Sequence, residues 1–199
     1  MKQTAINKRT EEKIRQAFLH LLNEHYFTQI TINMLVKEAG VSRGTFYVHY
    51  EDIYALRKQT QAVILQQLGT KTRDGLIAMV DDYQHGNHDI PSLAVHLEPG
   101  LVNAFNLRKS IHGLATNAGY ADFRKSLHDK FHTMLFRRNL FHADIVESMS
   151  AVPDDYVEEL IVTSMLSMIA YWLNKDNPET PAEFAVILLQ TLVIAPIHL

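Results

Sequence analysis

Five residues between Arg43 and His49 have the chemistry and the spacing of a nucleic-acid contact surface. Arg43 can donate two parallel hydrogen bonds to a guanine edge or a phosphate, and Gly44 lets a backbone come close. Thr45 offers a hydroxyl and a methyl group, while Tyr47 and His49 can donate to phosphate oxygens. The pattern predicts binding to double-stranded DNA. Its alternative is a solvated helix that covers a helical core.

Two short helices joined by a glycine turn must position this surface. Thr31 can cap the first helix, and Ser42 can cap the second. The first helix has one apolar stripe, formed by Ile32, Leu35, Val36 and Ala39. Gly40 ends this helix, because glycine takes a positive φ at little cost. Phe46 and Tyr50 lie four residues apart and can pack inward, which predicts a helix-turn-helix whose second helix enters the major groove.

A longer stretch around this motif resembles the DNA-binding domain of the TetR/AcrR family of bacterial transcription regulators. The similarity runs from about Thr10 to Leu56 and includes the phrase Tyr26-Phe27-x-x-Ile30-Thr31 and the block AGVSRGTFYVHYED. The resemblance implies a three-helix DNA-reading domain, a long connecting helix, and an all-helical C-terminal domain that dimerises. It also implies a small-molecule effector whose binding tilts the connecting helix and lowers affinity for the operator.

The resemblance assigns DNA contacts position by position. They fall on Thr31, Asn33, Lys37, Arg43, Gly44, Thr45, Tyr47 and His49. Two positions depart from the family's pattern: Asn33 stands where the family often has Arg, and Ile53 stands where it commonly has a Lys that meets phosphate. The phosphate contact at the start of the connecting helix is therefore expected to be weaker, or displaced to Arg57 and Lys58.

Composition and charge agree with a regulator that binds DNA through one end. The 199 residues are 47% hydrophobic and 21% charged, which predicts an ordered chain with one sizeable core or two modest ones. Residues 1–60 hold nine Lys and Arg against six Asp and Glu, whereas residues 61–199 hold ten against sixteen. A local basic patch is sufficient to meet phosphate. The absence of cysteine excludes a disulfide framework and a thiolate site, and suits a cytoplasmic location.

Helical periodicity and sparse glycine and proline predict an all-α fold. We expect an N-terminal three-helix domain with the helix-turn-helix over residues 1–52, and a larger helical ligand-binding and dimerisation domain over residues 53–199. The connecting helix is expected to start near Asp52. Gly69 and Gly75 are points where this helix can bend or end.

Two apolar helices close the chain. Residues 121–139 and 153–174 are predicted helices, and Thr180-Pro181-Ala182-Glu183 is a capping box that starts a last one. The uncharged runs are shorter than the roughly 20 residues that span a bilayer, so we expect buried helices and no membrane. The last two helices offer more apolar surface than one subunit readily buries, which predicts a homodimer, with a monomer as the alternative. Such a dimer reads a pseudo-palindromic operator with half-sites about 34–36 Å apart.

The effector and the sign of regulation are less constrained. Trp172-Leu173 and the later Pro-Glu-Thr-Pro-Ala-Glu segment weakly resemble regulators of dihydroxyacetone kinase operons, some of which activate with a protein partner. Activation therefore stays open beside repression. Candidate ligand contacts are side chains on the middle and late helices: Phe105, His112, Tyr120, Phe123, Phe131, Met134 and Tyr171. Residues of these types at helical spacing more often fill a core.

Other chemistries have less support. His128 and His132 have a spacing that can bind zinc, and His142 is a possible third ligand, but the metalloprotease pattern is missing, so we expect no metal or cofactor. The chain has no glycine-rich phosphate loop and no Gly-x-Ser-x-Gly motif, so we do not expect an enzyme. The alternative function is a helical adaptor or co-regulator that binds a protein partner instead of DNA.

Overall fold

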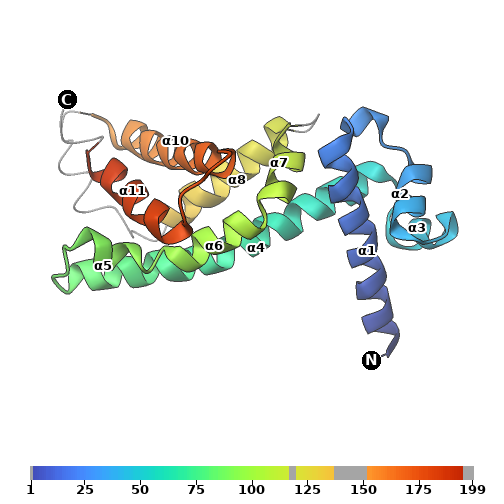
Figure 1. Cartoon of the computed structure of the whole chain (residues 1–199), viewed down its shortest axis with the longest axis horizontal. Helices are drawn as coiled ribbons and strands as arrows, with labels where there is room; N and C mark the ends of the chain where they lie inside the picture. Colours follow the sequence, from blue (N-terminus) through green and yellow to red (C-terminus); the bar gives the residue numbers. More distant parts are fainter. Residues whose placement is uncertain (1, 117–119, 137–151, 195–199) are drawn as a thin grey trace. The chain divides into compact units, whose positions relative to one another are not determined.

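The computed structural model describes residues 2–116, 120–136 and 152–194, and these ranges contain helices and no strand (Figure 1). In chain order the elements are α1 (Lys2–Glu24), the 3-10 helix η1 (Phe27–Gln29), α2 (Ile32–Ala39), α3 (Arg43–His49), α4 (Ile53–Gln84), α5 (Ile90–Ala94), α6 (Glu98–Asn106), α7 (Arg108–Thr116), α8 (Tyr120–Leu135), α10 (Asp154–Leu173) and α11 (Pro181–Ile194). The predicted all-α fold is confirmed.

The chain forms two compact units, and each unit is made of two separate stretches of the sequence. The first contains Met1–Ile64 and Lys109–Arg124, and the second contains Leu65–Arg108 and Lys125–Leu199. The change from one unit to the other therefore falls inside α4, after the first residue of α7, and inside α8. A functional boundary after residue 52 stays a prediction.

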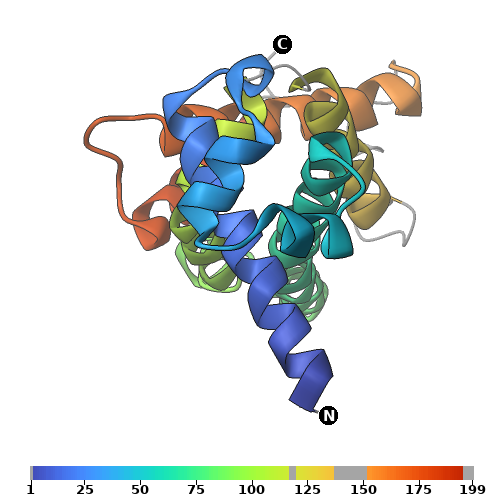
Figure 2. The same ribbon diagram turned by 90° about the vertical axis from the view of Figure 1, so that its right-hand side faces the viewer.

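The first unit is built on α1, which packs along α2, and α2 in turn contacts α3 (Figure 2). Its most deeply buried side chains are Ile14, Phe18, Leu35, Phe46, Leu56, Thr60 and Phe123. The rings of Phe18 and Phe27 meet edge to face with their centroids 6.2 Å apart. α7 also approaches α1 closely, because a Cβ on Gly113 would lie only 3.1 Å from the Leu22 Cβ. This core holds the helix-turn-helix on α1.

The second unit is organised around its two closing helices. α11 packs against α5, α6 and α10, and the core takes further side chains from α4 and α8 (Figure 1). Among the described helices, α10 alone is long and apolar enough to cross a membrane by length and composition, with 28% of that stretch buried. Val162 and Trp172 on α10 are completely buried in the core.

Trp172 lies at the centre of a column of rings. Its ring is parallel to that of Phe184, with the centroids 4.4 Å apart, and it lies 5.4 Å from the Phe105 ring. Its Nε1 donates a hydrogen bond to the Glu179 backbone oxygen at 2.9 Å, so the buried N–H is satisfied. The Arg108 Cζ lies 4.3 Å from the Phe105 centroid. The column ties α6, α10 and α11 together.

α4 runs unbroken through the two glycines at which we expected it to bend or end. A Cβ on Gly75 would collide with the His96 backbone oxygen, and one on Gly69 would collide with the Lys130 side chain. These glycines therefore provide room for neighbouring segments. The helix does not end at either glycine, and the neighbours that need this room are 21 and more residues away in sequence, so they leave no local signal.

The predicted late helices are confirmed where the structure describes them. α10 begins at Asp154, and α11 begins at Pro181 behind the expected capping box. The Thr180 N–H donates to Glu183 Oε2 at 2.9 Å, and the Glu183 N–H donates to Thr180 Oγ1 at 3.3 Å. α8 ends at Leu135, while residues 137–139 of that predicted helix lie outside the described residues.

The histidines on α8 face carboxylates on α10. The His128 Nε2 lies 2.9 Å from Glu159 Oε2, and the His132 Nε2 lies 2.9 Å from Glu158 Oε2. In the part of the chain that the structure describes, no group of three His, Cys, Asp or Glu side chains is placed to hold a metal ion. His142 lies outside the described residues. The two histidines thus link α8 to α10.

Candidate nucleic-acid interface

Two helix caps and a glycine turn, all predicted from the sequence, shape the helix-turn-helix. Thr31 Oγ1 accepts a hydrogen bond from the Met34 N–H at 3.3 Å and caps α2. Gly40 ends α2 with φ 64° and ψ 38°, a left-handed conformation that favours glycine. Ser42 Oγ then accepts from the Thr45 N–H at 3.0 Å and caps α3. The predicted caps and turn are confirmed as local structure.

α3 has one buried side and one exposed side. Phe46 and Tyr50 are buried as expected, and this burial raises the pKa of the Tyr50 hydroxyl above its ordinary value. The exposed residues lie three and four positions apart and therefore share one side of the helix: Arg43, Gly44, Tyr47 and Val48. We call these four residues the α3 face. The Tyr47 ring meets Phe46 edge to face at 5.5 Å, which restrains it at the surface.

Two of the residues predicted to face outward lie differently. The His49 side chain is only 7% exposed, and its Nδ1 lies 3.3 Å from Glu11 Oε1 on α1. Thr45 is partly buried, and its Oγ1 lies 2.8 Å from Ser42 Oγ. The outward orientation predicted for His49 was wrong, because a carboxylate 38 residues away in sequence contacts the ring.

The start of α4 carries an aromatic and cationic cluster. Asp52 caps the helix by accepting a backbone hydrogen bond at 2.7 Å. The exposed Tyr54 ring meets Phe27 edge to face at 5.3 Å, and the Arg57 Cζ lies 4.7 Å from the Phe27 centroid. Arg57 is therefore partly engaged with an aromatic ring, whereas Lys58 is exposed. That Arg57 and Lys58 contact phosphate in place of the residue at position 53 stays a prediction.

The remaining assigned positions lie on α2 or at its cap. Thr31, Asn33 and Lys37 are all exposed and belong to the same unit as the α3 face. The DNA contacts assigned to these three and to Arg43, Gly44, Thr45, Tyr47 and His49 stay predictions.

Solved structures share this arrangement of helices. A TetR transcriptional regulator from Streptococcus agalactiae 2603V is similar with a TM-score of 0.62, over 96% of this chain and 98% of its own, at 19% identity. A putative TetR-family transcriptional regulator from Syntrophomonas wolfei has a TM-score of 0.64, over 97% of both chains, at 17% identity. The chain has the TetR fold. The fatty acid degradation regulator FadR from Bacillus halodurans is also similar, with a TM-score of 0.58 over 93% of this chain and 95% of its own, at 14% identity.

Sequence comparison finds a relative whose name includes a helix-turn-helix. The chain is 25% identical over 171 residues to an uncharacterized HTH-type transcriptional regulator, YxbF, of Bacillus subtilis (strain 168). The match covers 86% of this chain and 41% of that regulator, so the chain spans less than half the length of this relative. No protein-family model matches the chain.

The candidate effector contacts are spread over both units of this TetR fold. The first unit holds His112 and Phe123, and the second holds Phe105, Phe131, Met134 and Tyr171. Three of these side chains are buried in the cores: Phe123, Phe131 and Met134. His112 and Tyr171 are exposed, Phe105 lies in the ring column, and the Tyr120 side chain is outside the described residues. Their role as ligand contacts stays a prediction.

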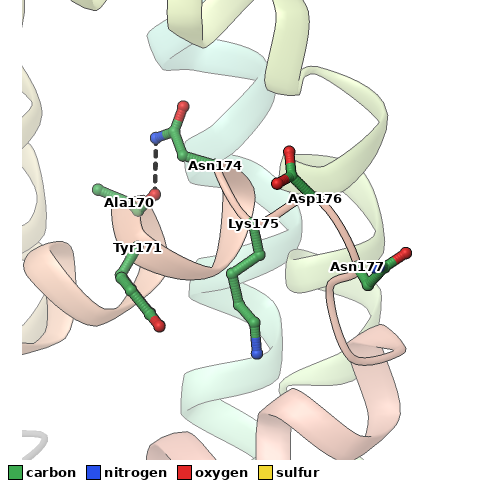
Figure 3. Close-up of a pocket in the computed structure, with 6 residues that line it drawn as sticks. All are labelled: Ala170, Tyr171, Asn174, Lys175, Asp176 and Asn177. Atoms are coloured by element: carbon green, nitrogen blue, oxygen red, sulfur yellow. Dashed lines mark hydrogen bonds between the residues drawn. The ribbon is translucent and has the colours of Figure 1, made fainter.

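Tyr171 borders a shallow surface depression at the end of α10 (Figure 3). Its volume is about 590 Å³, and it is lined by Ala170, Tyr171, Asn174, Lys175, Asp176 and Asn177. Asn174 Nδ2 donates to the Ala170 oxygen at 2.7 Å, and Lys175 forms an ion pair with Glu179. The polar groups of this open depression are thus partly engaged within the α10–α11 turn.

Two features of the interface escaped prediction from the sequence. Val48 is 78% exposed, and its place four residues after Gly44 was a signal that it shares the same helix side. The pair of His49 and Glu11 had no comparable signal, because it forms only when α1 folds against α3.

Proposed function

We propose that the chain is a sequence-specific DNA-binding transcription regulator. The observation that carries this proposal is the exposed α3 face on a helix capped at its start by Ser42. A guanidinium fork, a bare backbone, a phenol and two methyl groups are the kinds of group that meet phosphates, base edges and thymine methyls. The names of its relatives as transcriptional regulators support the same function.

The electrostatics of the chain also support a DNA target. The excess of positive charge lies in residues 1–60, which include the helix-turn-helix, and the remainder is acidic. On the α2 and α3 surface, Lys37 and Arg43 are exposed, and Lys58 is exposed on α4. Cations near the groove-reading helix favour association with phosphate, and this attraction weakens as salt rises. A DNA target also fits a cytoplasmic location.

The proposed regulator acts as a homodimer through α10 and α11. Three large side chains lie exposed on α10, with exposed fractions of 67% for Tyr156, 47% for Leu160 and 68% for Tyr171. Between Leu160 and Tyr171 the exposed residues are small, namely Thr163, Ser167 and Ala170. Their spacing places them along one stripe, and small central residues let another helix come close. A second copy of the chain is the occupant that would also give two α3 faces for a pseudo-palindromic operator.

We further propose that an unknown small-molecule effector or a protein partner controls DNA binding, and that the regulator usually represses transcription. An effector changes DNA affinity only by its differential affinity for the two states, typically about 1–3 kcal/mol. A ligand that weakens operator binding should therefore bind more weakly to the protein–DNA complex by the same factor. Isothermal titration of the free and DNA-bound protein measures both.

Fluorescence anisotropy with DNA from upstream of its own gene, and with duplexes selected from a random library, tests the function. We expect preference over a scrambled duplex, a steep loss of affinity with salt, and two subunits per site. Arg43→Ala and Tyr47→Phe should weaken specific binding without unfolding the protein. Arg73→Ala is the matched control, because Arg73 is an exposed arginine on α4 in the second unit. Equal weak binding to every duplex would contradict the proposal and favour the adaptor function.

A further inference from the structure

Val48 is the most exposed of the large hydrophobic side chains in the part of the chain that the structure describes, at 78%. It lies on the same side of α3 as Gly44 and Tyr47, one helical turn from the first and adjacent to the second. On the other side, the His49 side chain is only 7% exposed and contacts Glu11, and Thr45 is partly buried with its Oγ1 2.8 Å from Ser42 Oγ. At its C-terminal end the α3 face therefore presents the apolar side chain of Val48, whereas the sequence predicted the imidazole of His49 there.

The chemistry of the valine limits what it can recognise. Its side chain has two methyl groups, no hydrogen-bonding atom and a stiff χ1 angle, so it gains nothing from phosphate oxygens or from the polar edges of bases. The major groove presents one apolar group, the C5 methyl of thymine. A rigid branched side chain on a groove-reading helix matches that group in size and polarity.

We propose that Val48 is a specificity-determining residue that reads a thymine methyl group in each operator half-site. This inference rests on the proposed function, because it assumes that the α3 face enters the major groove. Gly44 supports this assignment because it has no side chain and lies one helical turn before Val48. The helix backbone and the short valine side chain can therefore approach the bases together. Arg43, at the start of the same face, is then the polar counterpart that reads guanine or phosphate.

Deoxyuridine scanning of the selected operator tests this assignment, because deoxyuridine differs from thymidine only by the C5 methyl group. Each thymine is replaced in turn, and the dissociation constant is measured for the wild-type protein and for Val48→Ala. One replacement per half-site should weaken wild-type binding by about fourfold, the value for one buried methyl group. Val48→Ala should bind the thymidine and deoxyuridine operators equally at that position. Circular dichroism should show that the exposed substitution leaves the fold intact.

Val95→Ala is the matched control, since Val95 is another exposed valine, at 62%, and belongs to the second unit. It should retain the wild-type pattern of deoxyuridine sensitivity. The assignment is overturned if no thymine position is sensitive in the wild-type protein, or if the same position stays equally sensitive in Val48→Ala. It is also overturned, together with the proposed function, if no duplex is preferred over a scrambled one. Specific binding without methyl sensitivity therefore removes the role of Val48 alone.

Discussion

Replacing Gly44 by alanine should raise the stability of the protein and lower its affinity for DNA. Gly44 lies within α3, its φ is not positive, and the nearest atom to an added Cβ is Ser42 Oγ at 3.7 Å, an ordinary contact. The new methyl group therefore meets no obstacle in the folded chain. It would instead stand in the middle of the α3 face, between Tyr47 and Val48.

The magnitudes follow from these two environments. Alanine is favoured over glycine inside a helix by about 0.5–1 kcal/mol, which for a chain of this size raises the melting temperature by roughly 1–4 °C. Gly40→Ala is the matched control of opposite sign, because the φ of 64° at Gly40 penalises a side chain by about 1–2 kcal/mol. At the DNA, a methyl group that separates the helix from the groove should reduce specific affinity by roughly tenfold or more, comparable to the loss of one good base contact.

Two assays measure the separation. Urea unfolding followed by circular dichroism gives the change in the free energy of unfolding, and anisotropy with the selected operator gives the change in affinity. A Gly44→Ala protein that is more stable but binds the operator as the wild type does would refute a close approach of this backbone to DNA. Lower stability would refute the helical, unobstructed environment of Gly44.

Three further substitutions address the second unit. Trp172→Phe removes the hydrogen bond to Glu179 and part of a stacked ring, so it should lower the free energy of unfolding by about 2–3 kcal/mol in urea, and an unchanged midpoint would contradict the ring column. Gly75→Ala should destabilise the protein more than an exposed glycine substitution does, because its Cβ collides with the His96 backbone, and a neutral result in thermal melting would count against this close packing. The pKa of Asp82 is held below its ordinary value mainly by the hydrogen bond from His96, so the stability that this carboxylate contributes is present above about pH 4 and is lost as the pH falls further. Asp82→Asn should flatten this acid-side decline in melting temperature, and an identical decline in both proteins would exclude Asp82 as its source.

Features set by neighbours in sequence could be predicted before the structure. The caps at Thr31 and Ser42, the turn at Gly40 and the capping box at Thr180 each depend on atoms within four or so residues. Their residue types have strong local preferences, so a single sequence identifies them. The long connecting helix, the late helices and the inward side of α3 follow from the same local rules together with apolar spacing, whereas α5, α6 and α7 were not predicted.

Features set by distant contacts could not be predicted in the same way. His49 has the residue type of a phosphate donor, yet Glu11 on α1 holds its ring, and only the packed structure brings the two together. Arg57 lies over the Phe27 ring for a similar reason. Gly75 showed that a glycine in a helix can be required by a crossing segment, which periodicity does not reveal.

Trp172 has a consequence for spectroscopy. It is the sole tryptophan of the chain, and it is enclosed in the second unit, stacked on Phe184 and bonded to a backbone oxygen of the α10–α11 turn. Indole emission depends on the polarity around the ring, so the native protein should fluoresce at short wavelength and shift to the red when this unit opens. The protein therefore carries its own optical reporter at the junction of α6, α10 and α11. Small molecules that rearrange this interior can be found by their effect on its emission, without any dye and before an operator is known.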